Sequence, residues 1–382
     1  MAPKICHIST VDISAGILLK NQMRYFADRG IETHAMAAPG RYVAEVEAAG
    51  IPFHPVGMTR TITPGQDLAS VWEMVQILRR ERFDLIHLHT PKAVLVGTIA
   101  GVIARVPHIW RTIHGFYFTR DTSVAVNTFF VNMERVVNRV HGVVFSQNGE
   151  DIPTAEQKGI RAAKDIILLG NGIDLTRFDP AHVDAARTNA LRAEYGIEKT
   201  DIVAGFVGRL VVQKGMREFM AAFEKIADDH PRLKLLLVGS VDHDKPDGVP
   251  PERHLPARLM DRVIQTGWQT DVERFYPLMD FFVLPSYREG FPRTPMEASA
   301  LGIPTVATDI RGCREAVKPG VNGILVKDRD ADSLAAGLAT MAGDHELRAR
   351  LGASGRALAL REFNEVDKFE TIYREYARVF GL

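Results

Sequence analysis

The chain has 382 residues, of which 46% are hydrophobic and 25% are charged, values typical of a folded globular protein. They exclude a disordered or fibrous chain. This length exceeds the size at which a single hydrophobic core stops growing, so two domains are expected. Basic and acidic residues both number 47, so net charge gives no reason to expect a nucleic-acid partner.

The cysteines and the first residues predict a cytoplasmic protein. Cys6 and Cys313 are far apart in the sequence, as is common in a reducing compartment. The N-terminal MAPKICHIST lacks the basic and long apolar segments of a secretion signal, and the apolar run 93–104 is too short to span a bilayer. We therefore expect at most a peripheral position on the cytoplasmic face of the inner membrane.

Strands and helices alternate from the N-terminus onward, a pattern typical of a parallel, doubly wound sheet. The expected strands are 5–8, 31–37, 85–88, 108–112 and 143–146, and the expected helices are 18–29, 68–82 and 93–104. Residues 170–180, GNGIDLTRFDP, have no hydrophobic period and read as a linker. The fold class is therefore α/β, with a first Rossmann-like domain over 1–171.

The same alternation restarts after the linker and predicts a second Rossmann-like domain over 172–362. The expected strands are 202–207, 235–238, 263–266, 281–284 and 305–307, and the expected helix is 215–226. In the last segment, 363–382, residues 366–380 predict a helix with aromatic residues on one face. This face has more apolar surface than an unattached tail would carry. We expect this helix to return to the first domain.

The sequence gives little support for a dinucleotide dehydrogenase or a P-loop NTPase. The motif G-x-G-x-x-G follows no predicted strand, and the motif G-x-x-x-x-G-K-[ST] does not occur. Ligands of doubly wound sheets lie beyond the carboxyl ends of the strands. The strand 202–207 ends in Gly208-Arg209, and Lys214 precedes the next helix. Two cations near a helix N-terminus can bind one diphosphate, although two solvated loop charges explain such a pair equally well.

Two glutamates follow the strand 281–284 in the stretch SYREGFPRTPMEASALGIP. Glu289 falls in the loop, and Glu297 falls on a helix expected to begin near Thr294. Gly290 and Pro292 would hold the loop in a fixed turn, so that one carboxylate could accept hydrogen bonds from sugar hydroxyls and the other from ribose hydroxyls. The alternative is that Glu289 is an acid at a helix start and Glu297 a solvated acid on that helix. That interpretation does not explain the Gly-Phe-Pro sequence between them.

Collinear motifs over almost the whole chain resemble the retaining glycosyltransferases of family 4, with the GT-B fold of two Rossmann-like domains whose parallel sheets face across a cleft. The resemblance is closest to the subgroup typified by CapM and PglA, which makes capsules and lipid-linked oligosaccharides. The motifs are HLHTPKA (87–93), IHGFYF (113–118), SQNGEDI (146–152), GNGID (170–174), EGFPRTPME (289–297) and RGCREAV (311–317).

The resemblance implies roles for individual residues. Arg209 and Lys214 would neutralise the donor diphosphate, Glu289 would hold the donor sugar, and Glu297 would bind the ribose. His114 would lie beside the sugar in the wall of the first domain. The residues implied as further donor contacts are Gly16, as the close-approach glycine of a first loop, Gly208, Gly290, Phe291, Pro292 and Arg293.

The resemblance also implies the reaction, in which a nucleoside diphosphate leaves through an oxocarbenium-like transition state and the acceptor attacks from the same face. The expected donor is a UDP-sugar, bound by the second domain. The expected acceptor is a polyprenyl-diphosphate-linked saccharide, bound by the first. Neither a metal nor another cofactor is expected. A nucleotide-sugar epimerase of the same fold, a non-catalytic binding subunit and a transferase with a soluble acceptor remain alternatives.

Other motifs have simpler interpretations. Asp242-His243-Asp244 resembles a D-x-D metal motif but lies in a Pro- and Gly-containing stretch typical of a solvated loop, and Asp328-Arg329-Asp330 suits a helix N-cap. His87 and His89 share one strand face as metal ligands could, but no third ligand has suitable spacing. FFVNMERVV (129–137) reads as a core helix more readily than a membrane insert.

Basic and aromatic residues alternate after the strand 108–112. We expect Phe116, Tyr117 and Phe118 either to contact a lipid boundary, with Arg111 and Arg120 at lipid phosphates, or to close the cleft over the donor sugar.

Overall fold

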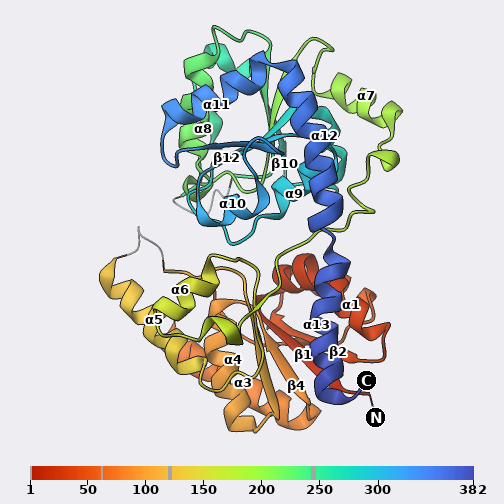
Figure 1. Ribbon diagram of the computed structural model, residues 1–382, viewed down its shortest axis with the longest axis vertical. Coiled ribbons are helices and arrows are strands. Elements are labelled where there is room, and N and C mark those ends of the chain that lie inside the picture. Colours follow the sequence, from red (N-terminus) through yellow and green to blue (C-terminus); the bar gives the residue numbers. More distant parts are fainter. Residues whose placement is uncertain (1, 62, 119–122, 242–246) are drawn as a thin grey trace. The chain divides into compact units, whose positions relative to one another are not determined.

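A computed structural model describes residues 2–61, 63–118, 123–241 and 247–382. The chain divides into two compact units (Figure 1). Unit 1 comprises Met1–Gly170 and Val366–Leu382, and unit 2 comprises Asn171–Glu365. The D-x-D-like residues 242–244 and Arg120 lie outside the described residues.

The described residues of unit 1 form a parallel seven-stranded sheet in the order β3-β2-β1-β4-β5-β6-β7. Its strands are β1 (Lys4–Val11), β2 (Glu32–Ala38), β3 (Phe53–Pro55), β4 (Leu85–Leu88), β5 (His108–Ile113), β6 (Val144–Ser146) and β7 (Ile167–Leu168). Its main helices are α1 (Lys20–Ala27), α2 (Val43–Ala48), α3 (Pro64–Glu81), α4 (Pro91–Ala104), α5 (Val124–Val137) and α6 (Asp151–Gln157). Short loops and buried apolar strands give the doubly wound arrangement that the sequence predicts.

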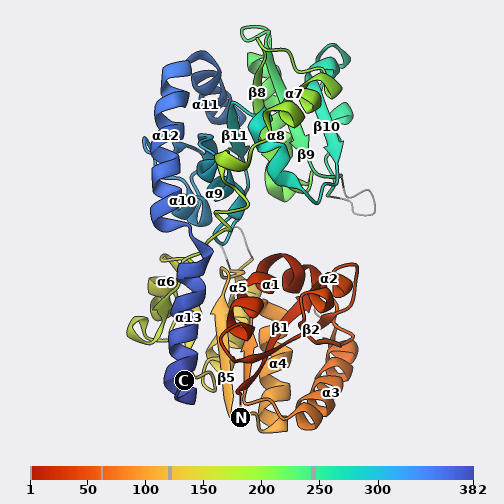
Figure 2. The ribbon, with the colours of Figure 1, turned by 90° about the vertical axis from the view of Figure 1, so that its right-hand side faces the viewer.

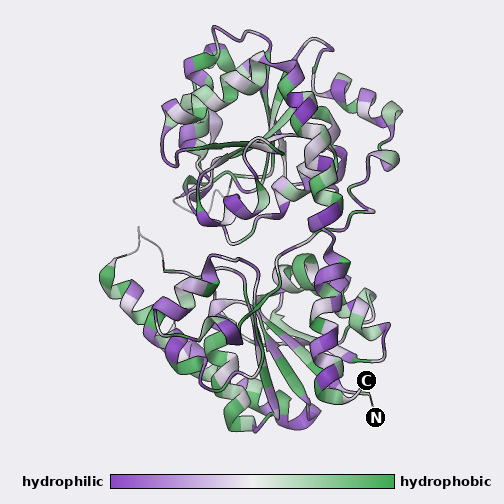
Figure 3. Ribbon diagram, in the orientation of Figure 1, coloured by the Kyte–Doolittle hydropathy of each residue, from purple (hydrophilic) through white to green (hydrophobic). Residues whose placement is uncertain are grey.

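The described residues of unit 2 form a parallel six-stranded sheet in the order β10-β9-β8-β11-β12-β13. Its strands are β8 (Ile202–Val207), β9 (Leu233–Val238), β10 (Val263–Gly267), β11 (Phe281–Leu284), β12 (Thr305–Thr308) and β13 (Gly323–Val326). Its α-helices are α7 (Ala185–Glu194), α8 (Met216–Ile226), α9 (Arg293–Ala300), α10 (Arg311–Ala316), α11 (Ala331–Gly343) and α12 (His345–Glu362). Figure 3 shows the strands of both sheets as largely hydrophobic, as parallel strands covered on both faces require.

The last helix, α13 (Glu365–Phe380), lies along one face of the sheet of unit 1 (Figures 1 and 2). Phe369, Ile372 and Tyr376 are buried in one cluster with apolar residues of the sheet and of α1. Tyr376 also stacks on Trp110, with ring centroids 5.1 Å apart. The aromatic face of α13 is therefore part of the core of unit 1.

Each sheet has one position where the strand order reverses, between β1 and β4 in unit 1 and between β8 and β11 in unit 2. The loops after these strands diverge there, which leaves space for a ligand at the carboxyl ends. In unit 2 these are the loops that carry Arg209, Lys214 and Glu289.

The expected first loop around Gly16 is wrong. Gly16 lies within a helical turn, η1 (Ser14–Leu19), which runs directly into α1. Ala15, Leu19 and Met23 are buried at helical spacing, and this period extends the helix to the N-terminal side of the predicted start. A side chain at position 16 would meet Tyr42 at 2.9 Å, so the close approach is to the protein's own chain.

Candidate active site

The loop after β8 positions two basic side chains at the switch point of unit 2. Gly208 follows the strand directly, Arg209 is exposed, and Lys214 closes a 3-10 turn, η4 (Val212–Lys214). Gly215 then adopts a left-handed conformation, with φ of 69°. A Cβ atom at Gly215 would lie 1.9 Å from the carbonyl oxygen of Pro285, so only glycine lets this turn pack against the chain after β11.

Lys214 and Glu289 meet across the switch point. Lys214 Nζ lies 2.5 Å from Glu289 Oε1, and both side chains keep some exposure, 26% and 12%. The backbone of Gly312 in α10 packs closely against this loop. A Cβ atom at position 312 would lie 2.5 Å from the carbonyl oxygen of Glu289, so a side chain there would push the loop away. The loop therefore presents a carboxylate and an ammonium group side by side at the end of the sheet.

Gly290, Phe291 and Pro292 connect Glu289 to α9. Pro292 is the N-cap residue of this helix and Arg293 its first residue, one position before the predicted start. The carbonyl oxygen of Phe291 accepts a hydrogen bond of 2.8 Å from Asn171 Nδ2. Arg293 forms an ion pair of 3.1 Å with Glu365, so its guanidinium group is held by the residue that begins α13.

Glu297 lies on α9 and is 8% exposed. Tyr276 donates its hydroxyl hydrogen to Glu297 Oε2 at 2.6 Å. Burial raises the pKa of Glu297 above its ordinary value, and Arg293, the hydrogen bond from Tyr276 and Arg177 oppose that rise. The carboxyl group of Glu297 is therefore buried and is fixed by a neutral hydrogen-bond donor.

His114 lies in unit 1, just after β5, and both of its ring nitrogens have protein partners. Nδ1 lies 3.0 Å from Gln147 Oε1, and Nε2 lies 3.2 Å from His89 Nδ1. Because an amide oxygen only accepts, His114 Nδ1 carries the hydrogen and Nε2 accepts from His89. Burial lowers the pKa of His114 to about 4, so the ring is neutral near pH 7.

His7 of β1 joins His87 and His89, a third imidazole that the sequence spacing did not predict. His7 Nδ1 lies 3.0 Å from His89 Nε2, while His87 bonds to Tyr376 and Thr112. The three rings are stacked, with interplanar angles of 17° to 24°. Lone pairs lie in the ring planes, and nearly parallel planes do not converge on one ion. This cluster of described residues is a hydrogen-bonded stack.

The run of basic and aromatic residues that begins in β5 and continues after it was expected to contact lipid, and this expectation is wrong for three of its residues. Arg111 is 3% exposed and forms a buried ion pair with Glu134 of α5. Phe116 and Phe118 are 3% and 7% exposed and belong to a buried cluster with α5 and α6. Of the described residues of this run, Tyr117 is the one with a largely exposed side chain, at 44%. The side chains of Arg111, Phe116 and Phe118 are buried.

Two sequence families match the chain. Residues 16–172 match "Glycosyl transferase 4-like domain", and residues 187–358 match "Glycosyl transferases group 1". A D-inositol 3-phosphate glycosyltransferase from Saccharomonospora viridis is 30% identical over 372 residues, which cover 90% of this chain and 81% of that protein. The chain belongs to glycosyltransferase family 4.

Two further proteins are similar to this chain over most of their length. The UDP-Gal:alpha-D-GlcNAc-diphosphoundecaprenol alpha-1,3-galactosyltransferase of Escherichia coli is 26% identical, with 83% of this chain and 81% of that protein covered. The crystal structure of HepE from Anabaena in complex with UDP-glucose is 25% identical, with a TM-score of 0.83 and 98% and 99% of the two chains covered. The fold is the predicted GT-B fold, and the protein is a glycosyltransferase.

The sequence indicated the switch-point loops of unit 2 but not the partners that hold their side chains. Asn171 and Gly312 fall within the motifs GNGID and RGCREAV, and Tyr276 falls outside the motifs. Only the fold shows that these three residues lie against Phe291, Glu289 and Glu297, in that order. In the described ranges, no helix is both long enough and apolar enough to cross a bilayer.

Proposed function

We propose that this protein is a retaining, metal-independent glycosyltransferase that moves a sugar from a UDP-sugar to a hydroxyl group of a polyprenyl-diphosphate-linked saccharide. The product would serve the synthesis of a cell-surface polysaccharide or glycan. Unit 2 would bind the donor and unit 1 the acceptor. The observation that carries the proposal is the Lys214–Glu289 pair at the switch point of unit 2.

In the donor site, Lys214 and Glu289 would bind different parts of the nucleotide sugar. Lys214 and Arg209 would bind the diphosphate, which replaces Glu289 as the partner of the ammonium group. Glu289 would then be released to accept hydrogen bonds from sugar hydroxyls, and Glu297 would bind the ribose. HepE is a structural relative that binds UDP-glucose, which supports a UDP-sugar as the donor.

The same cations would supply the main catalytic effect. Negative charge develops on the leaving diphosphate as the glycosidic bond breaks, and fixed positive charges stabilise that transition state by about 3 kcal/mol per contact. A leaving-phosphate oxygen would take the proton of the acceptor hydroxyl, which attacks from the face that the diphosphate leaves. The configuration at the anomeric carbon is then retained without a carboxylate base.

The acceptor class rests on the relative from Escherichia coli, whose named acceptor is a saccharide on diphosphoundecaprenol. The relative from Saccharomonospora viridis instead names D-inositol 3-phosphate, which makes a soluble acceptor the second candidate. Among the described residues that follow β5, Tyr117 is 44% exposed, and we propose that its exposed part meets a lipid surface. The proposed position of the protein is cytoplasmic and peripheral at the membrane.

Two measurements test this function. A panel of nucleotide sugars should contain a UDP-sugar that stabilises the protein by about 2.7 kcal/mol at a hundred times its dissociation constant. That donor should then be incubated with a polyprenyl-diphosphate-linked saccharide or with inositol phosphate, and the anomeric configuration of the product determined by NMR. An inverted product would contradict the retaining mechanism, and faster transfer to the soluble acceptor would contradict the acceptor class.

Liposome flotation tests the membrane position separately. The wild-type protein should float with vesicles that contain anionic lipid, and Tyr117→Ser should float less. The matched control is Tyr42→Ser, which removes a tyrosine from another part of unit 1. A wild-type protein that stays unbound in both neutral and anionic vesicles would contradict peripheral membrane association.

A further inference from the structure

The outer surface of unit 1 carries a group of exposed apolar side chains on α4 and α5, which cover the face of the sheet opposite α13 (Figures 1 and 2). Six of these side chains are 43% to 61% exposed: Ile99, Val102, Ile103, Phe129, Val136 and Val140. The exposed arginines beside them are Arg79, Arg105, Arg135 and Arg139. Single exposed apolar residues are ordinary, but a contiguous group marks a surface that binds a partner. We call these ten residues the basic apolar face.

The exposed residues of α5 follow the helical period. Phe129 and Val136 are seven positions apart, so they lie on one side of the helix, and Val140 follows one turn later. Val131 and Val137 are buried on the other side. The interpretation of the stretch FFVNMERVV as a core helix therefore holds for one side of α5.

α4 and the end of α5 are in contact, which makes their exposed residues one surface. His141 Nε2, just after α5, lies 2.8 Å from Thr98 Oγ1 of α4. These two residues are the chain neighbours of Val140 and Ile99, so the two exposed groups adjoin. Arg79 of α3 donates a hydrogen bond of 3.1 Å to a backbone carbonyl near the end of α4, and so borders the same surface.

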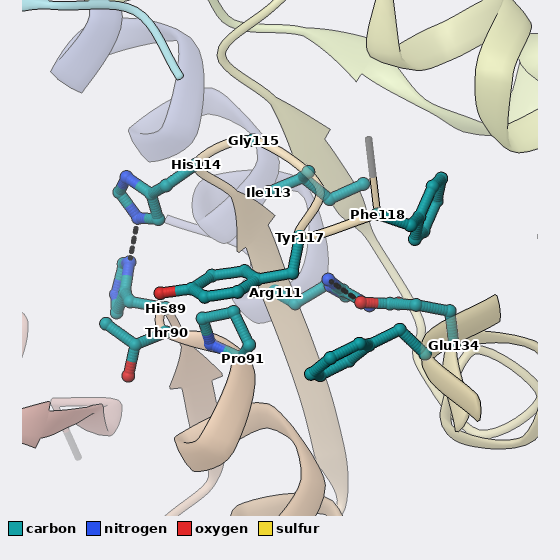
Figure 4. A pocket seen from close by; sticks show the side chains of 11 residues that line it. His89, Thr90, Pro91, Arg111, Ile113, His114, Gly115, Tyr117, Phe118 and Glu134 are labelled. Carbon is teal, nitrogen blue, oxygen red and sulfur yellow. Dashed lines mark hydrogen bonds and ion pairs between the residues drawn. The ribbon is translucent and has the colours of Figure 1, made fainter. Parts of the chain in front are cut away.

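The exposed charges of this surface have one sign. Residues 85–149 contain two acidic residues, Asp121 and Glu134. Glu134 is 4% exposed, and its carboxylate is paired with Arg111 inside unit 1 (Figure 4). Asp121 lies outside the described residues. In the described part of α4, α5 and the turns that follow them, the exposed charged side chains are therefore arginines.

A bilayer surface with anionic lipid headgroups fits this composition. Aliphatic and aromatic side chains can enter the boundary between headgroups and acyl chains while guanidinium groups meet lipid phosphates. A second copy of the chain fits poorly. A two-fold interface through this face would bring the arginines of both copies together, with no exposed carboxylate on α4 or α5 to pair with them.

We infer that the basic apolar face docks unit 1 on an anionic membrane, with the exposed side of α5 and the end of α4 against the lipid. The inference rests on the proposed function in one respect, because a lipid-linked acceptor would bring a transferase to a membrane. It goes beyond that function by naming the surface and the orientation. Tyr117 would lie at the edge of the contact, since its ring centroid is 5.9 Å from that of Phe130 on α5.

The first experiment measures binding of the full chain to vesicles of phosphatidylcholine alone and of phosphatidylcholine with phosphatidylglycerol. The double variant Arg135→Gln/Arg139→Gln should bind the anionic vesicles about 25-fold more weakly than the wild type, because each cation near such a surface contributes about 5-fold. The matched control is Arg374→Gln/Arg378→Gln, which removes two exposed arginines with the same spacing from α13. It should bind like the wild type. Equal weakening in both double variants would overturn the assignment to this face.

The second experiment reports the orientation of the bound protein. Cys6 and Cys313 are buried, so a nitroxide reagent would label a new surface cysteine. A label at Val136→Cys should become shielded from a water-soluble nickel complex when anionic vesicles are added. A label at Arg374→Cys, on α13, should stay accessible. A label at Val136 that stays accessible while the protein is bound would overturn the inference.

The outcomes separate this inference from the proposed function. A protein that docks through this face but transfers no sugar to any acceptor keeps the inference and loses the proposed function. A protein that transfers sugar to a lipid-linked acceptor in detergent but binds no vesicles keeps its transferase function and loses the inference. A dimer that Val136→Ser/Val140→Ser dissociates in analytical ultracentrifugation would show that the face joins two copies, and would overturn the membrane inference.

Discussion

Lys214 Nζ lies 2.5 Å from Glu289 Oε1, so two residues 75 positions apart in the sequence form one charged pair beyond the carboxyl ends of the central strands β8 and β11. Opposite charges at this spacing keep each other oriented. A diphosphate would compete for the lysine, and a sugar would compete for the carboxylate.

We expect Glu289→Ala to lower kcat by about 10²- to 10³-fold, the effect of losing one polar contact to a transition state, while leaving the circular dichroism spectrum unchanged. The measurement is initial-rate kinetics with saturating donor. Asp332→Ala is the control, because Asp332 also pairs with a lysine, Lys225, on the exposed surface of unit 2. Near-wild-type turnover of Glu289→Ala would show that this carboxylate does not hold the sugar.

Transfer should persist in EDTA, because Arg209 and Lys214 would supply the positive charge that a divalent ion provides in metal-dependent transferases. Asp242→Asn should also keep wild-type turnover. The measurement is product formation after dialysis against EDTA, with and without added manganese. Loss of activity that manganese restores would contradict the proposed metal independence and support the D-x-D motif.

Gly215→Ala should destabilise unit 2 by several kcal/mol more than Gly196→Ala. Both glycines have positive φ, 69° and 61°, so both variants carry the left-handed strain of about 1 to 2 kcal/mol. A Cβ atom at Gly215 would also strike the carbonyl oxygen of Pro285, whereas position 196 has no atom within 4 Å. Chemical denaturation measures the difference. Equal losses would mean that the turn moves away from Pro285 at little cost.

The features of this site that could be predicted from the sequence are those that depend on neighbouring residues in the chain. The strands 202–207 and 281–284 were predicted at their observed bounds, because short apolar runs between turn residues mark buried parallel strands. Asp330 is the N-cap of α11, as its position suggested, and accepts hydrogen bonds from the backbone of Asp332 and Ser333. Local chemistry decides such features.

Features that depend on distant partners were missed. Nothing in the sequence around Arg111 reveals that Glu134 neutralises it, so the sequence alone permits a lipid contact at this residue. His7 is 80 residues before His87, and only the parallel pairing of β1 with β4 brings them together. The resemblance to relatives implies a loop at Gly16, although the burial period of its neighbours extends a helix through it.

The stability of unit 1 should fall as the pH decreases from about 6.5 to about 4. Burial lowers the pKa of His114 to about 4 and of His7 to about 3, so the unfolded chain takes up protons in this range while the folded chain does not. Each such histidine contributes a slope of up to about 1.4 kcal/mol per pH unit. The contribution of these neutral histidines to stability is fully present above pH 6.5, which is near the pKa of a histidine in the unfolded chain.

Denaturation at pH 7 and pH 5 measures this slope. His114→Gln should reduce the difference between the two pH values, because glutamine takes up no proton. His345→Gln, at an exposed histidine at the start of α12, should leave it unchanged. A wild-type protein that is equally stable at both pH values would contradict the burial of neutral histidines in unit 1.

The position of α13 has a consequence for synthesis. His87 bonds to Tyr376, which leaves the ribosome 289 residues later, and all of unit 2 is made in between. Until then Trp110, Phe26 and the histidine stack lack the aromatic cover that α13 provides. Unit 2 can complete its core while unit 1 still waits for its last helix, so the half of the chain that is made first is the second to finish folding.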